Sequence, residues 1–77
     1  MIKVYATAWC GDCRLATRVL DAHAAAYEYI DIDDSPEAAE LVQKINGGFR
    51  SVPTILFPDG RVLVEPSKAE LEEALAA

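Results

Sequence analysis

"TAWCGDC", residues 7–13, contains both cysteines of the chain and separates two different hydrophobic patterns. Along residues 2–7, Ile, Val and Ala at the even positions alternate with Lys, Tyr and Thr at the odd positions, which is typical of a β-strand. From Asp12 to about Ala25 the spacing becomes helical, and the stripe predicted to face the core consists of Leu15, Ala16, Val19, Leu20 and His23. Cys10 is therefore expected in the loop after a first strand, at the N-terminus of a first helix, with Cys13 one turn further along.

The remaining segments continue this alternation of strands and helices. Residues 27–32 are rich in aromatic and β-branched side chains and predict a second strand. Ser35 followed by Pro36 is a helix start, and Asn46-Gly47-Gly48 ends that helix. Its apolar stripe is predicted to comprise Leu41, Val42 and Ile45.

A hairpin and a last helix complete the pattern. Residues 53–57 and 61–64 predict two short strands joined by a tight turn at Pro58-Asp59-Gly60. "SKAE", residues 67–70, is a capping box that opens a helix carrying Leu71 and Leu75. The order β-α-β-α-β-β-α predicts an α/β fold: one sheet, with two parallel strands joined by a right-handed helical crossover, a hairpin, and helices packed on it.

Composition restricts the class of protein. The 77 residues, 52% of them hydrophobic, are expected to form a single domain over residues 1–77. A net charge of −6 with scattered basic residues argues against nucleic-acid binding. No stretch approaches the roughly 20 apolar residues of a membrane span, and the first residues do not resemble a signal peptide. We therefore expect a cytoplasmic protein, in which C-x-x-C indicates redox or metal chemistry.

The predicted position of the two thiols favours redox chemistry. Unpaired backbone N–H groups and the positive end of the dipole at a helix N-terminus favour a thiolate over a thiol. Cys10 is expected to face solvent and to receive the N–H groups of residues 12 and 13, which makes it the attacking thiol. Cys13, shielded one turn into the helix, would be the resolving thiol. Asp12 complements the helix dipole but would also repel a thiolate, an effect that Arg14 or Arg50 could offset.

Four further residues have competing interpretations. Trp9 is either a packing residue or a contact surface beside the thiol, and we favour the second. Gly11 would allow a tight entry into the helix and close approach of a substrate. From the local sequence alone, Pro53 is predicted to be a proline that opens an edge strand. His23 lies 13 residues beyond Cys10, or about 20 Å along a helix, so it is excluded as a catalytic partner within one subunit.

Three segments together resemble the mycoredoxins, a glutaredoxin-like branch of the thioredoxin fold. They are "VYATAWCGDC" (residues 4–13), "NGGFRSVPTILFPDG" (46–60) and "VLVEPSKAEL" (62–71), so the resemblance covers nearly the whole chain. It implies a four-stranded mixed sheet of strand order 2-1-3-4. It also implies a thiol–disulfide oxidoreductase that releases a low-molecular-weight thiol, mycothiol or in related proteins bacillithiol, from mixed disulfides on proteins.

The resemblance also assigns roles to individual residues. Cys10 would be the nucleophile and Cys13 the second thiol. A cis peptide is implied at Val52-Pro53, with the Val52 backbone pairing with an extended substrate chain and with Arg50 and Ser51 lining the groove. The predicted substrate-binding site consists of Trp9, Gly11, Asp12, Arg50, Ser51, Val52 and Pro53.

The implied partners are a low-molecular-weight thiol, proteins carrying mixed or other disulfides and, as a possible reductant, a flavin disulfide reductase. No cofactor or metal is required, and a monomer is expected. Two departures argue against glutathione. Gly11-Asp12 stands where glutaredoxins usually carry Pro-Tyr, and residues 64–67 lack the Gly-Gly and acid with which many of them bind glutathione.

Two alternatives remain open. One is a general dithiol electron donor reduced by thioredoxin reductase. The other is a carrier that uses the C-x-x-C for a soft metal such as Cu(I), or for an iron–sulfur cluster bridged across a dimer. Tetrahedral zinc would need two ligands beyond the two thiols. The predicted order of strands and helices, together with Val52-Pro53, favours the redox interpretation.

Overall fold

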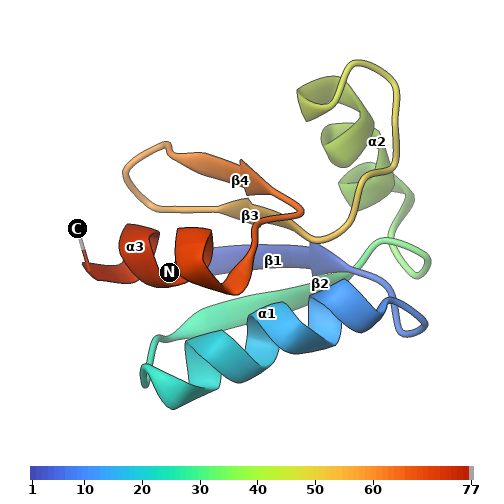
Figure 1. Ribbon diagram of the computed structural model, residues 1–77. Coiled ribbons are helices and arrows are strands. Elements are labelled where there is room, and N and C mark those ends of the chain that lie inside the picture. Colours follow the sequence, from blue (N-terminus) through green and yellow to red (C-terminus); the bar gives the residue numbers. More distant parts are fainter. Residues whose placement is uncertain (77) are drawn as a thin grey trace.

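The computed structural model describes residues 1–76 and contains one mixed sheet between two layers of helix (Figure 1). The order of elements is the one that the sequence predicts. The elements are β1 (Ile2–Ala6), α1 (Gly11–Ala22), β2 (Tyr27–Asp31), α2 (Pro36–Ile45), β3 (Thr54–Leu56), β4 (Val62–Val64) and α3 (Lys68–Ala76).

The sheet has the strand order β2-β1-β3-β4, as the resemblance implied. β1 runs parallel to β2 and antiparallel to β3, and β3 and β4 form an antiparallel hairpin. β1 is thus one of the two inner strands, and helices cover both of its faces. For this reason Tyr5 is buried as well as Val4, although the two side chains point to opposite faces.

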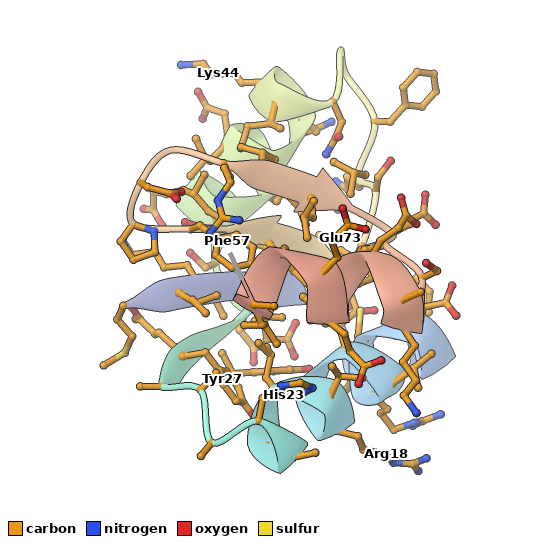
Figure 2. All side chains as sticks on the ribbon, turned by 60° about the vertical axis from the view of Figure 1, so that its left-hand side comes forward. Arg18, His23, Tyr27, Lys44, Phe57 and Glu73 are labelled. Carbon is orange, nitrogen blue, oxygen red and sulfur yellow. The ribbon has the colours of Figure 1, made fainter. Side chains whose placement is uncertain are left out.

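The helices divide between the two faces of the sheet. α1 and α3 lie side by side on one face, and α2 lies on the other (Figures 1 and 2). Leu20 of α1, Leu71 of α3 and Val42 of α2 are almost fully buried, and they belong to one core cluster that also includes Ile55 of β3. Residues of β1 and α1 belong to the same packed core, which fixes the two ends of the loop between them.

The buried stripes of α1 and α2 differ from the predicted ones. In α1, Ala16, Val19 and Leu20 are buried as predicted, but Leu15 is 40% exposed. In α2 the buried residues are Ala38, Ala39 and Val42, whereas Leu41 is 37% exposed. Leu15 and Leu41 each precede a buried position by one residue, which rotates them about 100° around the helix and away from the sheet.

α1 also ends earlier than predicted. Its last residue is Ala22, because His23 occupies the C-cap and Ala24 takes a left-handed φ of 52°. His23 is exposed rather than part of the stripe, and its Nε2 lies 3.1 Å from Oε2 of Glu72 on α3. His23, labelled in Figure 2, is the C-cap of α1 and Cys10 is its N-cap, in agreement with the exclusion of His23 as a catalytic partner.

The predicted helix and turn signals are confirmed. Ser35 Oγ accepts a hydrogen bond from the Ala38 backbone N–H at the start of α2. Ser67 and Glu70 form a reciprocal capping box at α3, in which each backbone N–H donates to the other side chain. Gly60 closes the β3–β4 turn with a φ of 94°.

Two matched substitutions on α1 test this packing. Leu20→Ala should lower the free energy of unfolding by about 2–5 kcal/mol, because it leaves a cavity in the core. Leu15→Ala, the same change on the exposed side of the helix, should cost less than about 1 kcal/mol. Urea unfolding followed by circular dichroism gives both values. Equal losses for the two variants would show that the α1 face is assigned wrongly.

Candidate active site

The loop after β1 places Cys10 at the N-cap of α1. The Cys10 backbone N–H donates to the Thr7 carbonyl at 3.3 Å, which turns the chain into the helix, and the Arg14 N–H donates to the Cys10 carbonyl. The Cys10 sulfur accepts a hydrogen bond from the Cys13 backbone N–H at 3.1 Å. The sequence predicted hydrogen bonds to this sulfur from the N–H groups of residues 12 and 13. In the described part of the chain, only the Cys13 N–H makes one.

The two thiols differ in environment. Cys10 is 8% exposed, so it lies at the floor of a groove rather than on the surface, while Cys13 is 1% exposed. Both are free cysteines. Burial raises the pKa of Cys13 to about 12, and its contact with Cys10 adds to the rise, although a hydrogen bond from the Thr7 backbone lowers it. Cys13 is therefore a neutral thiol at physiological pH.

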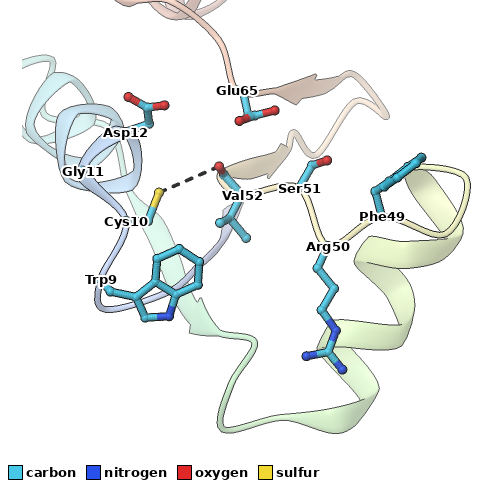
Figure 3. Close-up of a pocket in the computed structure, with 9 residues that line it drawn as sticks. All are labelled: Trp9, Cys10, Gly11, Asp12, Phe49, Arg50, Ser51, Val52 and Glu65. Carbon is cyan, nitrogen blue, oxygen red and sulfur yellow. Dashed lines mark hydrogen bonds between the residues drawn. The ribbon is translucent and has the colours of Figure 1, made fainter.

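The opposite wall of the groove comes from the segment before β3. Val52-Pro53 is a cis peptide, as the resemblance implied, and the strand begins only at Thr54. The Cys10 thiol donates a hydrogen bond to the Val52 carbonyl, with 3.8 Å between sulfur and oxygen (Figure 3). The sulfur thus touches the backbone on both sides: the start of α1 and the residue before Pro53.

A partly buried polar network fixes this wall to α2. Thr54 is fully buried, and its hydroxyl donates to the Ser51 carbonyl at 2.7 Å. Asn46, the C-cap of α2, donates through Nδ2 to the Thr54 hydroxyl at 3.1 Å and to the Val42 carbonyl at 3.0 Å. The asparagine that ends α2 therefore also orients the segment facing Cys10.

The groove has a volume of about 540 Å³ and is shown in Figure 3. Seven of the nine predicted site residues line it, whereas Cys13 and Pro53 are buried behind it. Two lining residues, Phe49 and Glu65, were not predicted. The complete set is Trp9, Cys10, Gly11, Asp12, Phe49, Arg50, Ser51, Val52 and Glu65.

Trp9 and Phe49 give the groove two exposed aromatic side chains. They are 71% and 72% exposed, so neither is a core residue. The Trp9 indole N–H donates to Oδ2 of Asp33 at 3.1 Å, which ties the ring to the segment after β2. This arrangement agrees with Trp9 as a contact surface. Phe49 follows two glycines with left-handed φ values of 65° and 103°, and this turn sets its side chain at the rim.

Gly11 leaves open space at the start of α1. A Cβ added to it would meet no atom within 4 Å, so the helix itself does not require a glycine there. Gly11 is one of the residues that line the groove. Close approach of a substrate at Gly11 therefore stays a prediction.

The described residues contain neither a metal-binding cluster nor a helix that could cross a membrane. Across residues 1–76, no three His, Cys, Asp or Glu side chains are grouped so that they could hold a metal ion. None of the three helices in this part of the chain has the length and apolar character needed to cross a bilayer.

The fold and the paired thiols at the start of α1 define a class: thiol–disulfide oxidoreductases with a thioredoxin-like fold. The Glutaredoxin family profile matches residues 2–63, and the chain belongs to this family. A Mycobacterium tuberculosis protein named "Putative glutaredoxin Rv3198A" is 42% identical over 74 residues, which cover 96% of this chain and 88% of that protein. Mycoredoxin 1 of Corynebacterium glutamicum is 40% identical over 70 residues, covering 91% and 86%.

Solved structures agree with this assignment. The thioredoxin-like protein BC3987 superposes with a TM-score of 0.82 at 25% identity, covering 95% of this chain and 97% of that one. The glutaredoxin-like NrdH-redoxin of Escherichia coli, described as having a thioredoxin-like activity profile, gives a TM-score of 0.79 at 25% identity, covering 94% and 91%. The resemblance inferred from the sequence and the predicted fold class are both confirmed.

The difference between the two thiols predicts selective alkylation. With a pKa of about 12, only about one Cys13 side chain in ten thousand is ionised at pH 8, and the thiolate is the reactive form. Iodoacetamide should therefore label Cys10 well before Cys13, and labelling of Cys13 should rise as the pH approaches 12. Peptide mass spectrometry measures both sites. Urea-unfolded protein, in which both thiols should react alike, is the control, and equal labelling in the folded protein would contradict the assignment.

Proposed function

We propose that this protein reduces mixed disulfides between proteins and a low-molecular-weight thiol, mycothiol or bacillithiol, with Cys10 as nucleophile. The observation that carries the proposal is the Cys10 sulfur at the α1 N-cap, on the floor of an open groove, with a backbone N–H directed at it from 3.1 Å. A helix N-terminus stabilises negative charge on sulfur, and the groove gives a disulfide access to it.

The proposed reaction has two exchange steps. The Cys10 thiolate attacks the small-thiol sulfur of the mixed disulfide, a new S–S bond forms at Cys10, and the protein thiol leaves as a thiolate that takes up a proton. A second small thiol, as its thiolate, then attacks the same small-thiol sulfur and releases Cys10 as a thiolate. The products are a reduced protein and the disulfide of the small thiol, so the electrons balance. Cys13 could instead attack Cys10, but it would first have to lose its proton.

The groove supplies the binding surface in this proposal. Trp9 and Gly11 bound the space on the α1 side of the sulfur, with Asp12 in the first turn of the helix. Arg50, Ser51 and Val52 form the facing wall, where the Val52 backbone would pair with an extended substrate. Pro53 would act from behind the wall, as a positioning residue, since it is buried.

Support for the choice of small thiol comes from the relatives. The similarity to Mycoredoxin 1 extends over 91% of the chain, which favours mycothiol over bacillithiol. Both cysteines are free, a state that suits a reducing compartment, and we propose the cytoplasm as the location and a monomer as the working form.

A dithiol electron donor is the second candidate. The similarity to the Escherichia coli NrdH-redoxin, with its thioredoxin-like activity profile, is the observation that favours it. In that case Cys10 and Cys13 would form a disulfide in each cycle, and a flavin enzyme such as thioredoxin reductase would reduce it.

Cysteine variants separate these two functions. With a protein carrying a labelled mycothiol, bacillithiol or glutathione mixed disulfide, Cys10→Ser should release no label, because the attacking sulfur is lost. Cys13→Ser should release label at a rate comparable with the wild type. The measurement is the loss of label from the substrate protein over time. The small thiol present in the mixed disulfide is also supplied in free form as the reductant.

Two outcomes would contradict the proposal. If Cys13→Ser is as inactive as Cys10→Ser while thioredoxin reductase reduces the wild-type disulfide, the electron-donor function is correct. Tight stoichiometric binding of Cu(I) or an iron–sulfur cluster by the reduced protein in equilibrium dialysis, without label release, would indicate a metal carrier.

A further inference from the structure

The charges around the groove are unevenly placed. Asp12 and Glu65 line it as acids, and Arg50 is its single base. Figure 3 shows the two carboxylates on the same side of the Cys10–Val52 contact, whereas the Arg50 guanidinium points away from the Cys10 sulfur. A ligand attached to that sulfur would therefore meet acidic groups before it met the base.

Neither of these two carboxylates is paired with a base in the described part of the chain. Within residues 1–76, neither Asp12 nor Glu65 takes part in a salt bridge or a side-chain hydrogen bond, since the two ion pairs of the structure are His23–Glu72 and Asp59–Arg61. The whole chain carries a net charge of −6, which adds a weaker field of the same sign.

The backbone of Glu65 supports a specific role for this residue. It follows directly on β4 and has a φ of 48°, a left-handed conformation that favours glycine over a residue with a Cβ. Its N–H donates to the Pro53 carbonyl at 2.9 Å, so the residue is anchored to the segment that faces Cys10. An unfavourable backbone conformation held beside a reactive group points to function. The feature that a glutamate offers there and a glycine lacks is a carboxylate over the groove.

We propose that Glu65, together with Asp12, selects the small thiol by charge: thiols that are neutral or positively charged near the sulfur are accepted, and carboxylate-bearing thiols are disfavoured. This inference rests on the proposed function, because it concerns the thiol that becomes bound to Cys10. Opposite charges attract and like charges repel over the few ångströms of a shared groove, and the effect weakens as salt screens it.

Three symmetrical disulfides of similar length test the inference. Cystamine carries an amine on each half, 2-hydroxyethyl disulfide is neutral, and 3,3′-dithiodipropionate carries a carboxylate on each half. Each is reacted with the Cys13→Ser protein, so that the mixed disulfide on Cys10 accumulates and can be quantified by mass spectrometry. Rates are divided by those of a neutral reference thiol, which removes the intrinsic reactivity of each disulfide.

The expected order of normalised rates is cystamine, then 2-hydroxyethyl disulfide, then dithiodipropionate, with each step about three- to tenfold at low salt. Adding Glu65→Gln should reduce the ratio between cystamine and dithiodipropionate by about threefold or more, and Asp12→Asn should act in the same direction. Raising the salt concentration should also reduce the ratio. Glu40→Gln, on the exposed side of α2, makes the same change in net charge away from the groove and should leave the ratio unchanged.

Glu65→Gly separates charge from folding. It removes the carboxylate and fits the left-handed backbone, so it should keep or raise the midpoint of thermal unfolding while it lowers the ratio as Glu65→Gln does. Equal ratios in the wild type and in Glu65→Gln would overturn the inference and leave the proposed function standing. Failure of Cys10 to react with any of the three disulfides would instead overturn the proposed function.

Discussion

The hydrogen bond from the Cys13 backbone to the Cys10 sulfur is the interaction on which the rest of the site depends. It exists because Cys10 is the N-cap of α1, and Cys10 is the N-cap because β1 ends at Ala6 and the loop turns back through the Thr7 carbonyl. The core contacts of Ala16 and Leu20 hold the helix against the sheet and so fix the position of its first turn. The same spacing buries Cys13, so a single geometric arrangement exposes one thiol to the groove and keeps the other protonated.

The second wall of the groove is built independently and by polar contacts. Asn46 and Thr54 join the end of α2 to Ser51, and the Glu65 N–H holds the Pro53 carbonyl from the side of β4. Residues 46–54 and 65 are distant from Cys10 in sequence, yet these contacts fix the segment whose Val52 carbonyl faces the Cys10 sulfur. In the proposed function, reactivity depends on the first turn of α1, and the choice of ligand depends on Asp12 of that turn together with Glu65 on the facing side.

The sequence predicted what short-range spacing determines and missed what depends on long-range placement. The strand–loop–helix at Cys10 and the caps at Ser35 and Ser67 follow from local patterns, and all are confirmed. Leu15 was misplaced because apolarity alone does not say which of two adjacent helical positions faces the sheet. Glu65 reaches the groove only through the pairing of β4 and its hydrogen bond to Pro53, which no spacing encodes. The cis peptide at Val52-Pro53 was predicted by the family resemblance alone, since local sequence favours the trans form.

The proposed function depends most directly on Cys10 forming its mixed disulfide with the small thiol and not with the substrate protein. Rapid acid quenching of the wild-type protein, in the middle of its reaction with a mixed-disulfide substrate, followed by mass spectrometry, identifies the intermediate. We predict a disulfide between Cys10 and the small thiol, with the substrate protein already reduced and Cys13 still a free thiol. A disulfide between Cys10 and the substrate protein, replaced later by a Cys10–Cys13 disulfide, would contradict the claim.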